Sequence, residues 1–297
     1  MKAAAQPAAP DRNALAALAV LTFIWGYNWV VMKVALAYSG PFVFAALRTS
    51  LGGLCLLLLL LLARKPFWPT RPWRALLLGL FQTTFFIGLV CWALVSGNAG
   101  KSAVLAYTMP FWVILLAPFF LGERLKGLQW LAVLLALGGL LLIFSPWHHT
   151  PDLFSSVLAL GAGVAWGISV IVAKQTPVDG GWDLLSLTGW QMLMGSAPLI
   201  LIALCVPAPA THWTPAFMWA LFYNVVPANA IAWALWLFAV GRLSATLSGL
   251  ASLASPIVGV LAGWLQLGEV PSPAETLGML LVFGALGLLS IGARPRR

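Results

Sequence analysis

Residues 25–33 read WGYNWVVMK, and residues 166–174 read WGISVIVAK. Each stretch opens with a Trp-Gly pair and closes with a lysine eight residues after the tryptophan, and the two stretches lie 141 residues apart. Recurrence at a fixed spacing is the sign of a structural unit that has been copied within the chain. We therefore predict a protein built from two related halves.

A second pair of motifs supports the same division. Residues 121–123 and 267–269 both read LGE, and each follows a proline, Pro110 or Pro256, by the same spacing. These motifs lie 146 residues apart, so the offset between the halves grows by five residues along the chain. We assign that difference to the loops between the second and third predicted helices of each half.

The composition indicates that the solvent of this chain is lipid. Of the 297 residues, 62% are apolar and 8% are charged, against roughly a quarter charged in an ordinary soluble domain. A mean hydropathy of +0.97 exceeds what one buried core can absorb. The net charge of +9 does not indicate nucleic acid, because the basic residues lie in short loops between apolar runs.

We predict an all-α integral membrane protein with ten transmembrane helices, because a span needs about 20 apolar residues. The predicted spans are residues 14–36, 41–63, 73–95, 101–121, 127–145, 153–174, 183–206, 214–239, 244–266 and 273–292. The chain divides into a disordered cytoplasmic tail at 1–13, a five-helix repeat at 14–145, a second five-helix repeat at 153–292 and a basic cytoplasmic tail at 293–297.

The positive charges predict that both termini are cytoplasmic. With the N-terminus inside, thirteen of the sixteen Lys and Arg residues fall on the cytoplasmic side, and only Lys33 and Lys101 fall outside. Such an asymmetry sets the orientation of a membrane protein, here in a bacterial inner membrane. Because five is odd, the second repeat enters the membrane from the opposite side. Inverted repeats are the architecture on which alternating-access transport is built.

These motifs resemble those of the drug/metabolite transporter superfamily, specifically its ten-span EamA-type members. The matching features are the Trp-Gly pair early in each half, the proline before each LGE, and Arg48 following Pro41 in the second span. The resemblance covers residues 14–292. The many tryptophans are similar to those of the bacterial aromatic amino-acid exporter branch, which implies export of amino acids or related metabolites. In the second half the position of Arg48 falls near Trp190, so the halves differ there.

Aromatic, amide and hydroxyl side chains within the spans are the candidates for a substrate cavity. Trp25 and Asn28 share one helical face, and in the repeat register Thr83 corresponds to Asn229. Amides at this depth face a partner helix or a cavity rather than lipid. An interhelical hydrogen bond, or packing of each tryptophan beside its glycine, is the alternative to substrate binding. The candidates are Trp25, Asn28, Gln82, Thr83, Phe86, Tyr107, Trp166, Ser169, Tyr223, Asn224, Asn229 and Ser252.

Two prolines inside spans are candidate gates. Pro110 and Pro256 each remove a backbone hydrogen bond in mid-span, and their symmetric placement predicts a bend that closes alternate ends of the cavity. A static kink that only shapes the bundle is the alternative. Gly100 and Gly249 would ease the bending.

Three charged residues are candidates for a structural or a substrate-binding role. Arg48 lies about 10 Å from the outer end of its span at 1.5 Å per residue, and a charge inside the membrane is a functional candidate. It could bind a substrate carboxylate, cap helix ends, or pair with Glu269 at the outer face. Glu123 and Glu269 lie at helix ends, where they could hold loops through basic groups.

The positions of the acids bear on mechanism. All seven Asp and Glu residues and all three His residues lie in tails, loops or span ends, whereas a proton relay needs an acid or a histidine at membrane depth. We therefore expect a facilitator, or uniporter, of neutral or zwitterionic solutes. A proton-coupled drug or metabolite exporter is the alternative, and a channel or membrane scaffold is the rival of another class.

The sequence carries no motif of a membrane enzyme: HExxH, GxSxG and an intramembrane pair of Asp residues do not occur. We expect a protein that is not an enzyme and that needs no cofactor or metal. The expected partners are a small-molecule substrate and the lipid bilayer, without nucleic acid. The sequence leaves the oligomeric state open, and a monomer is compatible with it.

Overall fold

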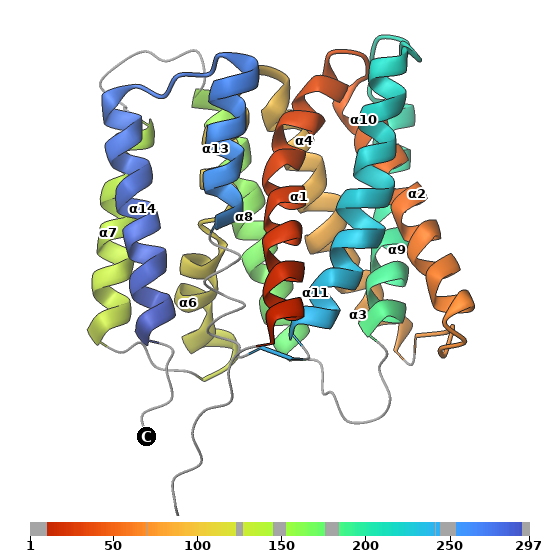
Figure 1. Cartoon of the computed structure of the whole chain (residues 1–297), viewed down its shortest axis with the longest axis horizontal. Helices are drawn as coiled ribbons and strands as arrows, with labels where there is room; N and C mark the ends of the chain where they lie inside the picture. Colours follow the sequence, from red (N-terminus) through yellow and green to blue (C-terminus); the bar gives the residue numbers. More distant parts are fainter. Residues whose placement is uncertain are drawn as a thin grey trace, which may run out of the picture.

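The protein is a bundle of helices in a computed structural model (Figure 1). The structure describes residues 11–69, 71–122, 127–144, 153–175, 184–240, 242–243 and 254–292. The first half contains α1 (Arg12–Leu36), α2 (Pro41–Leu62), α3 (Pro72–Gly79), η1 (Leu80–Phe85), α4 (Phe86–Ser96), α5 (Ala99–Ala106), α6 (Met109–Phe120) and α7 (Gly127–Phe144). The second half contains α8 (Leu153–Lys174), α9 (Leu184–Cys205), α10 (Pro215–Val225), η2 (Val226–Ile231), α11 (Ala232–Val240), α13 (Ala254–Leu267) and α14 (Pro273–Gly292).

The ten predicted spans coincide with these helices, so the all-α membrane fold is confirmed. Among the described residues, eight helices or helical runs are long and apolar enough to cross a bilayer, and two shorter apolar helices, α13 and α14, complete the set. The third predicted span is the continuous run α3–η1–α4, and the eighth is α10–η2–α11. The start of the ninth predicted span, residues 244–253, lies outside the described residues.

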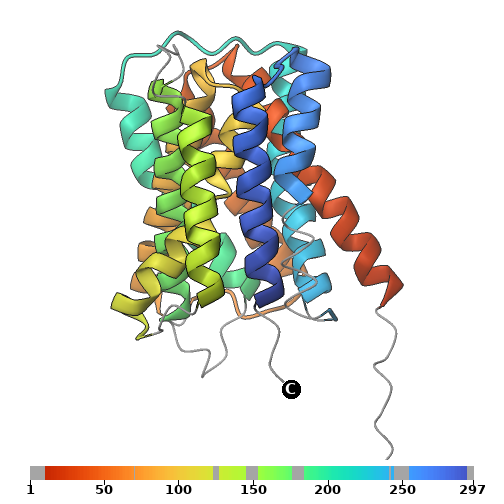
Figure 2. The same cartoon turned by 90° about the vertical axis from the view of Figure 1, so that its left-hand side faces the viewer.

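The two halves interlock according to one pattern. The second helices of the halves, α2 and α9, pack against each other, and so do the fifth helices, α7 and α14 (Figures 1 and 2). Each first helix crosses to the other half: α1 packs on α13, and α8 packs on α5 and α6. A contact between element i of one half and element j of the other is thus matched by its converse, as a two-fold relation between repeats requires.

The two first helices run in opposite directions. Lys33, in the last turn of α1, donates to the carbonyl of Gly97, which follows the end of α4. Gln175, which follows α8, instead accepts from Arg74, at the start of α3. The third span therefore meets the end of α1 at one of its ends and the end of α8 at the other, which gives the inverted arrangement. The start of α1 and the end of α14 lie at the same end of the bundle (Figures 1 and 2).

The glycine of each Trp-Gly pair permits a close helix crossing. A Cβ on Gly26 would lie 2.6 Å from the Ser255 carbonyl oxygen of α13, and a Cβ on Gly167 would lie 2.8 Å from the Cβ of Trp112 in α6. Real Cβ atoms do not approach neighbours this closely, so each position requires glycine. The repeated Trp-Gly motif thus fixes the crossing of each first helix with the fourth span of the other half.

A π-helical turn interrupts the third span of each half. The two turns, η1 at Leu80–Phe85 and η2 at Val226–Ile231, begin 146 residues apart, which is the offset of the LGE motifs. A π-turn bonds i to i+5 instead of i+4 and is frequent at functional sites. Polar residues gather in these turns, among them Gln82, Thr83 and Asn229.

The fourth span is interrupted in mid-span beside Pro110, as the sequence predicts, but the proline begins a new helix instead of removing a bond inside a continuous one. The fourth span is divided between α5 and α6 at residues 107–108, and Pro110 lies in the first turn of α6, where an amide has no intrahelical partner to lose. Pro256 is buried in α13, and the residues before Ala254 lie outside the described part of the chain. A Cβ on Gly100 would come within 2.7 Å of the Val260 Cα, so this glycine allows close packing of α5 on α13. Gly249 lies outside the described residues.

Candidate substrate cavity

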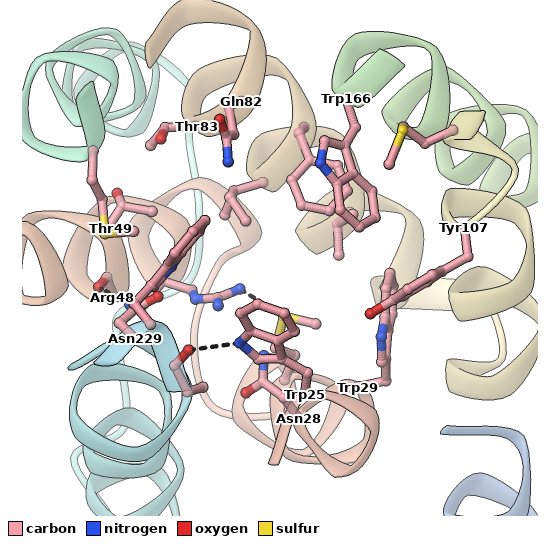
Figure 3. A pocket seen from close by; sticks show the side chains of 18 of the residues that line it. Trp25, Asn28, Trp29, Arg48, Thr49, Gln82, Thr83, Tyr107, Trp166 and Asn229 are labelled. Carbon is pink, nitrogen blue, oxygen red and sulfur yellow. Dashed lines mark hydrogen bonds between the residues drawn. The ribbon is translucent and has the colours of Figure 1, made fainter. Parts of the chain in front are cut away.

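A cavity of about 370 Å³ lies between the two halves at the level of the π-turns. Its described lining comes from α1, α2, η1, α4, α6, α8, α9, η2 and α11, together with Tyr107 (Figure 3). Most of the lining is aromatic or aliphatic, with a small set of polar groups. Both the size and the composition match a small-molecule site, for which volumes of about 300–1,000 Å³ are usual.

The tryptophans of the two Trp-Gly motifs project into this cavity from different sides (Figure 3). Trp25 donates its indole N–H to the carbonyl of Ala228 in η2 at 3.0 Å, and its ring packs on Trp233 and Trp236 with centroids 5.7 and 6.0 Å away. Trp166 packs instead on Phe86 and Tyr107, at 5.0 and 5.2 Å. Each tryptophan therefore belongs to an aromatic cluster that forms part of the cavity wall.

One polar cluster surrounds η1. The hydroxyl of Thr83 donates to the Gln191 side-chain oxygen of α9 at 2.9 Å, and Thr84 donates to the carbonyl of Gly195 at 2.6 Å. Both bonds join the third span of the first half to the second helix of the second half. Gln82 and Gln191 line the cavity beside Thr83. We call the pair Thr83 and Gln191, with Gln82, the η1 cluster.

A second polar cluster surrounds η2. Asn229 donates to the backbone carbonyl of Arg48 in α2 at 3.4 Å, and Thr49 lines the cavity next to it. The Nη1 of Arg48 lies 2.7 Å from the sulfur of Met32, and its Nε has no hydrogen-bond partner. We call Arg48, Thr49 and Asn229 the η2 cluster. It occupies the same place at the third span of the second half as the η1 cluster does at the third span of the first half.

The structure brings eight of the twelve predicted cavity residues together in the lining. These are Trp25, Asn28, Gln82, Thr83, Phe86, Tyr107, Trp166 and Asn229. Ser252 lies outside the described residues.

Three predicted residues do not line the cavity, contrary to expectation. Ser169 donates back to the carbonyl of Trp166 within its own helix. Tyr223 donates to the carbonyl of Ile24 in α1, and Asn224 is fully buried and donates to the carbonyl of Ala220. These side chains satisfy backbone groups instead of facing the cavity.

Arg48 of α2, a sequence candidate for a substrate carboxylate, lines the cavity, but its neighbour Thr49 and the lining residues of α9 were not among the candidates. Thr49 and Gln191 line the cavity together with Met192. The signal that could have found them is their spacing of 142 residues, which is close to the offset of the Trp-Gly motifs. A polar residue at matching places in the second helices of both halves is the pattern expected at the repeat interface.

Glu269 does not pair with Arg48, so that predicted pairing is wrong. It forms an ion pair with Lys33 at 2.7 Å and accepts from the Ala99 amide at 2.7 Å. A second ion pair joins Lys101 and Glu275 at 2.9 Å. These contacts tie α1 and α5 to the loop after α13 and to the first turn of α14, at the end of the bundle opposite the start of α1. Glu123 lies outside the described residues.

The lining offers binding groups rather than reactive ones. It contains one guanidinium, four side-chain amides, two threonine hydroxyls and several aromatic rings among its described members, and no carboxylate, histidine or serine. In the described part of the chain no three His, Cys, Asp or Glu side chains gather as a metal site requires. Such a cavity can enclose and orient a small amphiphilic molecule.

Similarity to known protein families identifies the class of protein to which this cavity belongs. The model of the EamA-like transporter family matches residues 13–145 and again residues 153–291. The chain therefore belongs to the EamA-like transporter family, within the drug/metabolite transporter superfamily. It is a membrane transporter with two EamA repeats and does not belong to an enzyme family.

Several bacterial proteins are similar along most of their length. The uncharacterized transporter YoaV of Bacillus subtilis is 28% identical, with 88% of this chain and 91% of YoaV covered. The uncharacterized protein PA1977 of Pseudomonas aeruginosa is 31% identical, with 94% and 95% covered. The uncharacterized inner membrane transporter YedA of Escherichia coli K12 is 23% identical, with 93% and 90% covered.

A solved crystal structure shares the fold. It is 19% identical to this chain, covers 93% of this chain and 97% of its own, and has a TM-score of 0.64. At this level of identity the likeness concerns the arrangement of the helices alone.

Proposed function

We propose that this transporter exports amino acids, aromatic or otherwise hydrophobic and neutral, and related metabolites from the cytoplasm by alternating access. The observation that carries the proposal is the cavity, in which two aromatic clusters face amide and hydroxyl groups from the two π-turns. The rings suit an apolar side chain, and the polar groups suit a zwitterionic head group.

The location of the cavity supports alternating access. It lies where the inverted halves meet, and its wall combines α1, α2, η1, α4 and α6 of the first half with α8, α9, η2 and α11 of the second. Rocking one half against the other would open this one site to each side of the membrane in turn. The ion pairs Lys33–Glu269 and Lys101–Glu275 would then have to separate in the outward-open state.

The charges support a facilitator. Among the described residues, Glu269 and Glu275 are held in ion pairs at one end of the bundle, and no acid or histidine lines the cavity. A proton relay through the site would need such a group. Solute would then move down its own gradient.

We also propose an inner-membrane location with both termini in the cytoplasm. The bias of Lys and Arg toward one side supports this orientation, and YedA, a relative, is described as an inner membrane transporter. A fusion of a cytoplasm-active reporter to the C-terminus tests it, since activity only of a periplasm-active reporter would reverse the orientation.

Counterflow in proteoliposomes tests the function. Purified protein is reconstituted with a high internal concentration of unlabelled phenylalanine, and uptake of labelled phenylalanine and other amino acids is followed with and without an imposed pH gradient. We expect transient accumulation of hydrophobic amino acids that does not depend on the pH gradient. Accumulation driven by the pH gradient alone would establish the proton-coupled alternative.

Thiol labelling separates a transporter from a channel. A cysteine at Thr83 faces the cavity, and a membrane-impermeant reagent is applied from one side at a time. Saturating substrate should shift labelling between the sides, because alternating access opens one side at a time. Equal labelling from both sides at once would identify a channel.

A further inference from the structure

Arg48 is a buried cation without a counter-charge. It is 5% exposed, lies in the first half of α2, and its guanidinium reaches toward the middle of the cavity (Figure 3). A guanidinium stays charged in proteins, so burial cannot remove the charge by deprotonation. Burying an unpaired charge is costly unless something in the site compensates it.

The protein groups around Arg48 do not supply that compensation. Its Nη1 lies against the sulfur of Met32, its other sulfur neighbour is Cys91, and its Nε has no partner. Sulfur is a weak acceptor. None of the described lining residues is an Asp or a Glu, and the described ion pairs involve Lys33, Lys101 and Arg242 instead.

A second unsatisfied group lies one helical turn from this contact. The side-chain oxygen of Asn28 is buried and has no partner, and Asn28 precedes Met32 by four residues on the same face of α1. The unpaired polar atoms of these two lining residues are thus a cationic donor and a neutral acceptor. The donor carries a full charge and the acceptor does not.

We infer that the substrate carboxylate binds to the guanidinium of Arg48 and is the part of the substrate that the site requires. The inference rests on the proposed function and narrows its substrate class to carboxylates with an apolar or aromatic side group. The Nε and the Nη groups of an arginine form a planar fork that binds both oxygens of a carboxylate. The aromatic clusters around Trp25 and Trp166 then receive the side group.

The ammonium group contributes less to binding. It meets the neutral oxygen of Asn28 and ring faces, which attract cations more weakly than a carboxylate does. Acids that lack the amino group, such as 3-phenylpropionate or the 2-oxo acids, therefore enter the same site. Cations without a carboxylate are repelled by Arg48, which argues against cationic drugs as cargo.

A matched set of three ligands tests this order of importance. Phenylalanine carries both groups, 3-phenylpropionate lacks the ammonium, and phenylalaninamide lacks the carboxylate. Each is used as a competitor of labelled phenylalanine in counterflow, and each is titrated by quenching of tryptophan fluorescence in purified protein, where rings lining the cavity report occupancy. We expect 3-phenylpropionate to bind at least about tenfold more tightly than phenylalaninamide, as one lost charge-assisted hydrogen bond implies.

Two variants locate the effect at Arg48. Arg48→Gln should abolish the preference for the acid over the amide, and Arg48→Lys, which keeps the charge without the fork, should retain part of it. Arg64→Gln is the matched control, because Arg64 is exposed beyond the end of α2 and should leave the preference unchanged.

The outcomes separate the two claims. Absence of labelled phenylalanine counterflow in the unmodified protein would overturn the proposed function, while the fluorescence titrations would still decide the inference. Equal binding of the acid and the amide would overturn the inference, whatever the transport result. The same holds if Arg48→Gln folded, judged by its elution as a single species, and kept the full preference. Failure of both variants to fold leaves the ligand series on the unmodified protein to decide.

Discussion

The η1 cluster and the η2 cluster occupy equivalent places in the two halves, yet only one is charged. At η1, Thr83 is bonded to the neutral side chain of Gln191. At η2, Asn229 bonds only to the backbone of Arg48, and the guanidinium faces the cavity. Both halves contribute equivalent helices to the site, while a single arginine places a positive charge on only one side of the cavity. A substrate can therefore bind in one orientation although the scaffold is symmetric.

The packing behind the two clusters also differs, and glycine substitutions should show it most strongly. A Cβ on Gly195 would collide with the Gly79 carbonyl oxygen and lie 2.6 Å from the Thr83 Cβ. A Cβ on Gly52 would meet the side-chain amide of Asn229, which can move. We expect Gly195→Ala to lower the free energy of unfolding by about 1–3 kcal/mol, and Gly52→Ala by less than about 1 kcal/mol.

Thermal unfolding in detergent, with transport measured in parallel, checks this pair. Gly52→Ala should still slow transport, because displacing Asn229 disturbs the cavity wall. An equal loss of stability in both variants would contradict the difference between a backbone and a side-chain neighbour.

Removing the polar partner in each cluster should have the next largest effect. Thr83→Val leaves the buried oxygen of Gln191 without its donor, which should cost about 1–2 kcal/mol. Asn229→Leu removes a long bond of 3.4 Å to a carbonyl that already accepts within α2, so its cost should be smaller. Chemical unfolding curves of the two variants give the comparison, and a greater loss for Asn229→Leu would show that the η2 cluster is the more tightly bonded one.

The two tryptophans of the Trp-Gly motifs offer a finer test. Trp25→Phe removes the bond to the Ala228 carbonyl, whereas Trp166 is placed by ring packing. The lost ring volume is the same in both, so Trp25→Phe should be less stable than Trp166→Phe by about 1 kcal/mol, the usual worth of one hydrogen bond. The difference in midpoint between the two melting curves measures this quantity directly, and coincident curves would refute it.

The smallest effect is expected at the first of the two prolines. Pro110 lies in the first turn of α6, where proline is tolerated and costs no intrahelical hydrogen bond. Pro110→Ala should change the free energy of unfolding by less than about 1 kcal/mol and leave the transport rate nearly unchanged. Initial rates of counterflow check the second part. A rate that falls several-fold at unchanged stability would restore the gating role expected from the sequence.

The helices and the two-fold organisation of the bundle could be predicted from the sequence, because they follow from the hydropathy pattern and from the repeated motifs. The spans, the two halves and the equivalence of Thr83 with Asn229 all follow from patterns along the chain. The π-turns could not be predicted, because they alter hydrogen bonding without altering hydropathy. Side-chain directions near η2 were therefore uncertain by about 100° per residue, and Tyr223 and Asn224 were wrongly assigned to the cavity.

The ion pairs at the end of the bundle could not be predicted from the sequence either. Lys33 and Glu269 are 236 residues apart and belong to different halves, so only the packing of α1 on α13 brings them together. The sequence offered Arg48 as a partner for Glu269, yet the Arg48 side chain faces the cavity. Charge and depth in the membrane predict which residues have a role, whereas the ion-pair partner of each residue depends on how the helices pack.

The matching position of the two π-turns has a consequence for the cavity. A π-turn holds one more residue than the α-helical turn it replaces, so it records an inserted residue. Two independent insertions would have no reason to fall in the same register, yet η1 and η2 begin 146 residues apart, as the LGE motifs do. A shared register is what a single feature of the repeated unit gives, so one local irregularity of that unit supplies polar groups to both sides of the cavity.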